Sequence, residues 1–353
     1  MNRLKSTVLV VCAAVIATAS VFIYAPLSSA QSASLSIMPR KNYTIEPGKS
    51  VNDTLTIRNL DSTKPLHLSL RVVDFTFNDD TGAPKLMLDE NEPETTWSLK
   101  RYLSIPKNVT IEPNTSQTLD MSVAIPEGHG AGSLYSAIVY SSSSSEGGNV
   151  GLSASGVTLV FAQIPGQVNE KLTLEKLGAY DEKKAASGDG YMYFAGEKPE
   201  KIAYTLKNDG NVTESPVGSI TLRHLFGKET VIQDVNPNGS LALIGQTRTF
   251  TSCIKKQNQE VNFNGTRSEA TTCAEPDLWP GYYSVELSAF YGQNGNRTQD
   301  LVGTASFWYL PWWFVFAVLA ALAFVGYHIW KIVRFIRRKR SGAQLKKRTP
   351  RRK

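Results

Sequence analysis

The middle of the chain alternates hydrophobic and polar residues with a period of two. Clear examples are residues 54–58, 66–72 and 119–125, and the pattern returns at 202–206 and 283–290. This period indicates strands with one buried face and one face in water. Glycine, proline, asparagine and aspartate punctuate the runs at intervals of about ten residues, as in an antiparallel β-sandwich. The fold class that we predict is therefore all-β.

The alternating region is roughly 275 residues long, which is enough for two domains of ordinary size. We expect a first β-sandwich domain at 31–166 and a second at 167–306, divided at Pro165-Gly166. The Ser/Gly-rich stretch Ser141–Asn149 resembles a linker. The strand-like run Val157–Ile164 follows it and needs a sheet to join, so we predict a long hairpin loop within the first domain.

The first 30 residues predict an export signal. Arg3 and Lys5 precede an uncharged run from Val8 to Tyr24, and Ser28-Ser29-Ala30 offers small residues for cleavage. The apolar run is rather long, so an uncleaved anchor is the alternative. Either reading places the following residues outside the cell.

A second uncharged segment predicts one transmembrane helix at 307–331. No Asp, Glu, Lys or Arg occurs from Leu301 to Trp330, and about 20 apolar residues suffice to cross a bilayer. Pro311 suits the first helical turn. A buried core helix is the alternative, but a basic tail would not follow it. The aromatic side chains predicted to anchor the two membrane interfaces are Trp308, Tyr309, Trp312, Trp313, Tyr327 and Trp330.

Residues 332–353 form a basic tail that we expect in the cytoplasm. From Lys331 to Lys353 there are 12 Lys or Arg residues and no acidic residue. Basic residues beside a spanning helix stay on the cytoplasmic side and attract anionic membrane lipid. The predicted location is thus the cell membrane, with a single pass and the ectodomain outside. The predicted stop-transfer cluster consists of Lys331, Arg334, Arg337, Arg338, Lys339 and Arg340.

The predicted ectodomain has a negative net charge, although the whole chain is positive. The whole chain has a formal charge of +7, but residues 331–353 hold 12 of its 38 basic residues and the signal segment two. The remaining 24 basic residues face all 31 acidic residues, which leaves a charge of about −7. We therefore expect no nucleic-acid partner.

The cysteines predict one disulfide. Cys12 lies in the signal segment, and Cys253 and Cys273 remain as a pair in an oxidising compartment. Their bridge would close a loop of about 20 residues and contribute about 3 kcal/mol in the chain-entropy model. Two thiols without a nearby histidine leave a zinc site incomplete.

No catalytic constellation stands out along the chain. The four histidines are scattered, and the turn Asn78–Gly82 lacks the full ligand series and the distal glutamate of a calcium loop. We therefore expect no metal, no cofactor and no small-molecule substrate, and we do not predict an enzyme. A surface hydrolase with a non-standard site is the remaining alternative.

Several short motifs accompany this order of parts. They are Ile45-Glu46-Pro47-Gly48, Ile125-Pro126-Glu127-Gly128 followed by Tyr135–Val139, Asn208-Asp209-Gly210-Asn211, Pro280-Gly281-Tyr282-Tyr283 and Phe307–Trp312. Together they resemble the WxL-interacting cell-surface proteins of Gram-positive bacteria. The paired glycines expected after Tyr135 are missing, which indicates a distant member.

The resemblance implies two immunoglobulin-like sandwiches, the first related to pilus chaperones. It also implies peptidoglycan binding through the first domain and surface partners through the second. The predicted function is a non-enzymatic, membrane-anchored scaffold for binding or adhesion that engages cell-wall polymer or surface proteins. Partners could add a strand to an open sheet edge. The alternative is an accessory or assembly-chaperone subunit of a membrane or surface complex.

Overall fold

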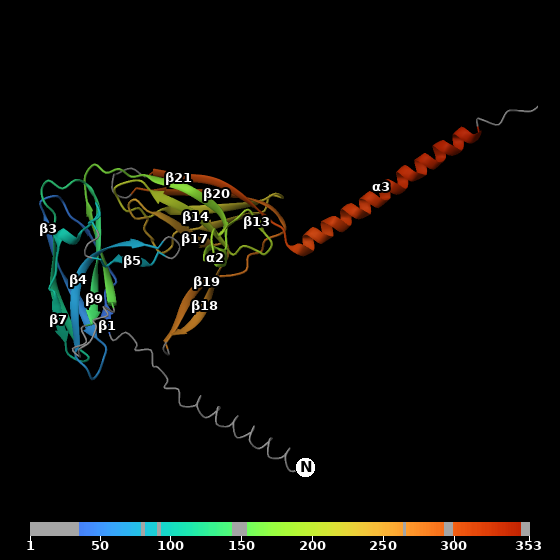
Figure 1. Cartoon of the computed structure of the whole chain (residues 1–353). Coiled ribbons are helices and arrows are strands. Elements are labelled where there is room, and N and C mark those ends of the chain that lie inside the picture. Colours follow the sequence, from blue (N-terminus) through green and yellow to red (C-terminus); the bar gives the residue numbers. More distant parts are fainter. Residues whose placement is uncertain are drawn as a thin grey trace, which may run out of the picture.

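The computed structural model shows two β-sandwiches followed by one long helix (Figure 1). It describes residues 35–78, 82–89, 93–142, 154–263, 266–292 and 299–346. The predicted export signal at 1–30, the tip of the turn at 78–82 and most of the Ser/Gly-rich loop lie outside the described residues.

The first sandwich consists of ten strands within the described residues, together with the short 3-10 turn η1 (Lys100–Tyr102). The strands are β1 (Leu35–Ile37), β2 (Arg40–Thr44), β3 (Ser50–Asn59), β4 (Leu66–Phe77), β5 (Pro84–Met87), β6 (Leu103–Ser104), β7 (Asn108–Ile111), β8 (Ser116–Ala124), β9 (Gly132–Ser142) and β10 (Ala154–Ile164).

Strand order gives the first sandwich an immunoglobulin-like topology. One sheet has the order β1-β3-β8-β6, and the other has β2-β10-β9-β4-β5 with β7 beside β4. The first stretch of chain serves both sheets, since β1 pairs antiparallel with β3 and β2 pairs parallel with β10. In the usual strand letters these sheets correspond to A-B-E-D and G-F-C.

The second sandwich repeats this plan. Its elements are β11 (Leu172–Tyr180), α2 (Glu182–Ala185), β12 (Tyr191–Met192), β13 (Phe194–Ala195), β14 (Lys201–Asn208), β15 (Val217–His224), β16 (Glu229–Gln233), β17 (Thr247–Cys253), β18 (Lys256–Phe263), β19 (Thr266–Cys273), β20 (Gly281–Tyr291) and β21 (Gln299–Tyr309). The sheets have the orders β12-β11-β14-β17 and β13-β21-β20-β15-β16, and β18 and β19 form a separate two-stranded ribbon. The predicted all-β class with two immunoglobulin-like sandwiches and one C-terminal helix is confirmed.

Each sandwich has its own hydrophobic core. One buried cluster is drawn from residues 45–164 and another from residues 172–309. A third cluster joins them: Phe75, Tyr135 and Phe161, on the outer face of the first sandwich, pack with Leu243 of the second. Ser133 N–H also donates to Asn211 O at 3.0 Å. The sandwiches therefore share a packed and hydrogen-bonded junction.

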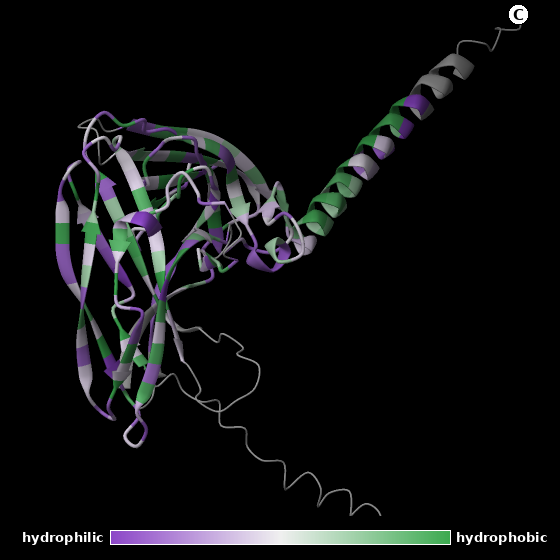
Figure 2. Cartoon of the chain, turned by 60° about the vertical axis from the view of Figure 1, so that its left-hand side comes forward, coloured by the Kyte–Doolittle hydropathy of each residue, from purple (hydrophilic) through white to green (hydrophobic). Residues whose placement is uncertain are grey.

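The long helix α3 (Trp312–Lys346) begins directly after the second sandwich. Its segment Trp312–Arg337 is long and apolar enough to cross a membrane, and none of that segment is buried within the protein. Figure 2 shows hydrophobic residues along the part of α3 nearest the sandwich and hydrophilic residues further along it. Which end faces the cytoplasm stays a prediction.

The start of the predicted span at residue 307 requires a correction. Strand β21 continues to Tyr309, so Phe307, Trp308 and Tyr309 belong to the sandwich. Phe307 and Tyr309 face the core and are almost fully buried. The uncharged segment Leu301–Trp330 contains the end of β21 as well as the first part of α3. The absence of charge therefore placed the start of the span too close to the N-terminus. Tyr309 anchors the sandwich core and not a membrane interface.

Candidate binding edge of the first sandwich

The strand beside β8 ends almost as soon as it starts. β6 has only two residues, Leu103 and Ser104, which pair with Val123 and Ser122 of β8. Pro106 follows closely, and proline has no N–H with which to extend a ladder. The chain then crosses to the other sheet, where Lys107 O accepts a hydrogen bond from Leu70 N–H at 2.7 Å.

This crossing leaves the first six of the nine residues of β8 without a neighbour on one side. Residues Ser116–Met121 pair with β3, but within the described part of the chain no strand lies along their other edge. Alternate backbone N–H and C=O groups of such an edge strand point outward and can pair with another chain. We call residues Ser116–Met121 the open edge.

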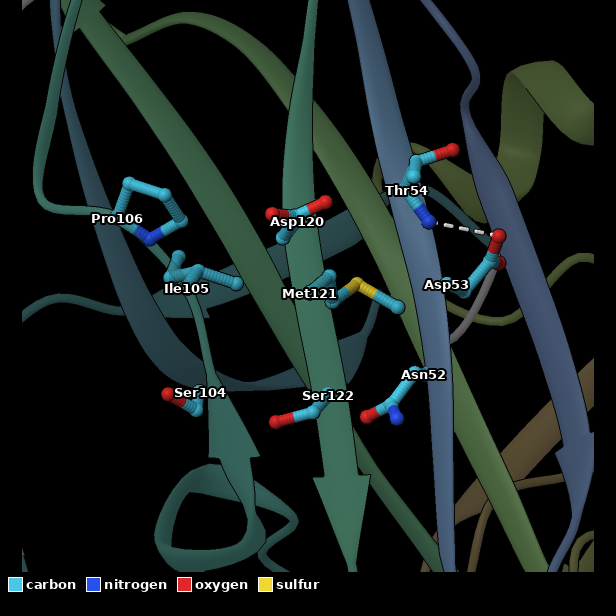
Figure 3. Close-up of a pocket in the computed structure, with 9 residues that line it drawn as sticks. All are labelled: Asn52, Asp53, Thr54, Ser104, Ile105, Pro106, Asp120, Met121 and Ser122. Carbon is cyan, nitrogen blue, oxygen red and sulfur yellow. Dashed lines mark hydrogen bonds between the residues drawn. The ribbon is translucent and has the colours of Figure 1, made fainter.

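A hollow of about 650 Å³ lies where β6 ends and the open edge begins. Figure 3 shows Ile105 and Pro106 on one side of β8, and Asn52 and Thr54 of β3 on the other. The exposed side chains around it are amides, hydroxyls and a carboxylate, which donate and accept hydrogen bonds readily. They come from Asn52, Thr54, Ser104, Asp120 and the half-buried Ser122.

The opposite margin of the same sheet carries a charge directed inward. β1 pairs only with Ile57–Asn59 of β3, so the first part of β3 also lacks a neighbour among the described strands. There, Asp53 accepts hydrogen bonds from Lys41 Nζ and Tyr43 Oη, both at 2.5 Å, and both donors belong to β2. Inward-pointing charges discourage edge pairing, so this margin is guarded and the open edge of β8 is not.

The same contacts shift the pKa values of the guarding groups. The Lys41 ammonium and then the Tyr43 hydroxyl, as hydrogen-bond donors, lower the pKa of the Asp53 carboxyl to about 2. Burial, followed by the hydrogen bond to Asp53, raises the pKa of Tyr43. Asp53 is therefore ionised, and this margin of β3 stays charged, at all physiological pH values.

The structure joins Cys253 to Cys273, in agreement with the predicted pair, with Cα atoms 5.2 Å apart. The bridge closes the β18–β19 ribbon, which projects from the second sandwich (Figure 1). An isolated hairpin is at best marginally stable in water, so the disulfide holds the base of the ribbon together.

The remaining predicted site residues do not converge. Trp312, Trp313, Tyr327 and Trp330 are exposed along α3, and the half-buried Trp308 lies in β21. Their role as membrane-interface anchors stays a prediction. The stop-transfer residues Lys331, Arg334, Arg337, Arg338, Lys339 and Arg340 all lie within α3. Across the described residues, no group of three or more His, Cys, Asp or Glu residues could hold a metal ion.

No protein-family model matches the chain, and no curated protein does. Similar solved structures include the E. coli chaperone DraB, with 14% identity over 78% of this chain and 96% of that chain and a TM-score of 0.31. The Pseudomonas aeruginosa CupB2 chaperone has 10% identity over 78% and 100%, with a TM-score of 0.31. The class 5 fimbriae chaperone CfaA has 10% identity over 76% and 98%, with a TM-score of 0.32.

These neighbours share a sandwich architecture with this chain. At such identities and TM-scores they do not indicate what this chain binds. The resemblance to WxL-interacting proteins likewise stays a prediction, because no family model supports it.

An open sheet edge was expected from the sequence, but its position on β8 was not predicted. The run at 119–125 indicates a strand, but its neighbour is decided by where β6 stops and crosses to the other sheet. Pro106, closely following a two-residue strand, is the one local signal of that crossing.

Proposed function

We propose that this chain is a membrane-anchored, non-catalytic binding scaffold whose first sandwich holds an extended segment of a partner protein along the open edge. The observation that carries this proposal is the unpaired part of β8 beside a hollow of mixed polar and apolar lining. An added strand would lie about 4.8 Å from β8 and pair with its outward N–H and C=O groups.

Side chains around the open edge would contribute specificity. Along β8, Leu119 and Met121 are buried, whereas Thr118 and Asp120 are exposed on the outer face. A bound strand would place alternate side chains beside Thr118 and Asp120, while Ile105 and Pro106 provide an apolar wall. Main-chain bonds would then supply affinity, and these contacts would select the sequence.

The proposed setting is the outer surface of the cell membrane. Support comes from α3, whose apolar segment has the length needed for one crossing, and from the basic cluster at its far end. Surface proteins are the partners that this geometry favours. An assembly chaperone would use the same edge, and would differ from a scaffold by releasing its partner.

Cell-wall polymer is the second candidate partner. Asn52, Thr54 and Ser122 offer amide and hydroxyl groups on one face of the sheet, and these pair well with sugar hydroxyls. A glycan would lie across the face of β3 and β8, whereas a peptide strand would lie along the outer side of β8. The two candidates therefore differ in the residues that the ligand contacts.

Site-specific photocrosslinking in cells distinguishes these partners. A photoreactive amino acid replaces Thr118 in the full-length chain, and the matched control replaces Thr56, its exposed register partner on β3. Strand addition predicts a discrete protein adduct at position 118 and little at 56, because position 56 is one strand further from the added chain. The captured segment is then synthesised with N-methyl groups on alternate residues.

The N-methylated peptides provide the decisive measurement. Methylation of the residues that face β8 should abolish binding to the full-length chain, and methylation of the intervening residues should not. Adducts of equal yield at 56 and 118, together with binding to purified peptidoglycan, would support the glycan instead. No adduct at position 118 would refute the open edge as a binding site.

A further inference from the structure

The second sandwich ends in a row of aromatic side chains next to α3. In the five-stranded sheet, Phe194 of β13 lies opposite Trp308 of β21, which lies opposite Tyr282 of β20. Leu225 continues the row, since its N–H donates to Tyr282 O at 3.0 Å. Residues directly opposite each other in a sheet point to the same face. The row therefore runs across the outer face at one end of the sandwich.

Neighbouring residues extend this surface beyond the sheet. Tyr193 packs against Phe194 with ring centroids 4.8 Å apart, Phe226 follows Leu225 at the tip of the β15–β16 hairpin, and Trp279 precedes β20. Phe194 is 62% exposed, Trp279 69% and Phe226 84%. We call Tyr193, Phe194, Leu225, Phe226 and Trp279 the aromatic end.

The adjacent rows of the same sheet show that this exposure is not a general feature of the strands. Ala195 and Tyr309 lie in the row on one side of the aromatic row, Tyr283 and His224 lie in the row on the other side, and all four are buried. Large apolar side chains gathered on an exposed surface mark a site of interaction with a protein or a membrane.

The chain itself holds the aromatic end close to the helix. Only Leu310 and Pro311 separate Tyr309 from Trp312, the first residue of α3. Leu310 N–H donates to Ala195 O at 2.8 Å, which fixes the exit of the chain beside β13. Three residue steps span at most about 10 Å. If Trp312 lies at a membrane interface, the side of the aromatic end formed by Tyr193 and Phe194 lies next to that interface, because Trp308 N–H donates to Tyr193 O at 2.8 Å.

Charges near the aromatic end are largely neutralised. Lys198 pairs with Glu275 at 2.7 Å, and Lys255 pairs with Asp277 at 2.9 Å. Lys228 Nζ donates to the backbone carbonyl oxygen of Asp277 at 3.3 Å, so this lysine keeps its charge. This surface is therefore suited to the interfacial region of a bilayer through its rings, as in aromatic belts, and not through attraction to anionic lipid.

We propose that the aromatic end rests in the headgroup region of the same membrane that α3 crosses, so that the second sandwich lies against the bilayer. The outer-leaflet lipid would cover Phe194, Leu225, Phe226 and Trp279, with Trp312 and Trp313 alongside. This inference rests on the proposed membrane span but not on the open edge of the first sandwich.

Depth-dependent quenching tests this inference in the full-length chain. The chain, reconstituted in phosphatidylcholine vesicles, carries a small environment-sensitive fluorescent amino acid at position 226. Matched samples carry it at position 217, where Val217 is 48% exposed at the opposite end of β15, and at position 320, in the middle of the apolar part of α3. Spin-labelled lipids with the label at the headgroup or deep in the acyl chain act as quenchers.

The expected result is strong quenching at 226 by the headgroup label, strong quenching at 320 by the deep label and none at 217. Raising the salt concentration should leave the signal at 226 unchanged, since the contact is not electrostatic. Deep quenching at 320 without quenching at 226 would overturn the inference and leave the span intact. An unquenched 226 that is also shielded from aqueous iodide would mean that protein covers it, and absence of quenching at 320 would overturn the span together with the inference.

Discussion

β8 in the first sandwich and β17 in the second occupy the same position in the topology. Each pairs along its length with the long strand beside it in its sheet, which is β3 for β8 and β14 for β17. Each also has an edge that lacks a full-length neighbour among the described strands. Their exposure nevertheless differs. On the open edge of β8 the outward side chains are exposed, whereas those of β17 are half-buried.

The surroundings of the two strands account for this difference. Arg248 of β17 lies over the ring of Phe77 in the first sandwich, 4.9 Å from its centroid, and donates to Leu241 O at 2.6 Å. Ser252 donates to Val235 O at 2.9 Å. The junction between the sandwiches and the loop after β16 thus pack against the core-facing side of β17, and on its outer face the Thr249 hydroxyl lies 2.9 Å from the Thr205 hydroxyl of β14. Coverage by neighbouring segments, and not the strand itself, decides which edge can accept a partner.

Among the substitutions predicted to alter stability, removal of the disulfide at the end of β17 should have the largest effect. The double variant Cys253→Ser, Cys273→Ser should lower the free energy of unfolding of the second sandwich by about 3 kcal/mol in the chain-entropy model. The β18–β19 ribbon at the end of β17 should also become sensitive to protease. Denaturant unfolding and limited proteolysis of the full-length chain measure both effects, and reduction of the wild-type chain is the matched control. Identical cleavage and unfolding of variant and wild type would contradict this prediction.

Glu214 makes the stability of the loop after β16, which contains its backbone partner Ala242, dependent on pH. Its backbone N–H and C=O pair with Ala242, and its fully buried carboxyl accepts from Gly292 N–H at 3.1 Å. Its other carboxyl oxygen has no hydrogen-bond partner among the described residues. Burial raises the pKa of Glu214 from 4.5 to about 7, so the neutral form is favoured in the folded chain.

The variant Glu214→Gln should therefore stabilise the second sandwich at high pH. A raised folded pKa gives stability that is complete below about pH 4.5 and is lost as the pH rises through about 7. At pH 8 the glutamine variant should be more stable than wild type by on the order of 2 kcal/mol, and at pH 4 the two should match. Thermal unfolding across this range measures the difference. A constant difference at all pH values would contradict the assigned burial of the carboxyl.

Sequence patterns predict where the strands and the helix occur better than they predict which strands pair with one another. Alternation predicts strands such as β8 and β20, and the lack of charge predicts α3, because both depend on residues close in sequence. The same patterns do not show that β6 stops after Ser104 or that Tyr309 still belongs to a strand. Those features depend on which strands meet. Likewise, Glu214 gives no signal in the sequence, since its burial comes from Ala242 and Gly292, which are distant along the chain.

Arg248 tests whether the junction protects β17. Replacing it in Arg248→Met removes the contacts with the rings of Phe77 and Phe250 and the hydrogen bond to Leu241 O, at a cost of about 1 to 2 kcal/mol. Coupling between the sandwiches should weaken, so that one unfolding transition separates into two in calorimetry. The exposed Arg58→Met in β3 is the matched control and should change little. A single unchanged transition in Arg248→Met would mean that the junction does not depend on this side chain.

The smallest effect on stability, and the most direct test of edge guarding, is expected at Asp53. The variant Asp53→Thr removes the charge held by Lys41 and Tyr43, and the loss of a half-exposed ion pair should cost less than about 1 kcal/mol.

The unpaired part of β3 would then resemble the open edge of β8, and the full-length chain in detergent should form concentration-dependent dimers in sedimentation velocity. Because the pKa of Asp53 is lowered to about 2, its contribution persists above about pH 4 and fades as the pH falls toward 2, so wild type should dimerise only in strong acid. Glu112→Thr, which removes an exposed carboxylate in the turn before β8, should stay monomeric at neutral pH. Dimers in the Glu112 variant at neutral pH would attribute association to lost net charge, and a monomeric Asp53 variant would show that the inward carboxylate does not guard this edge.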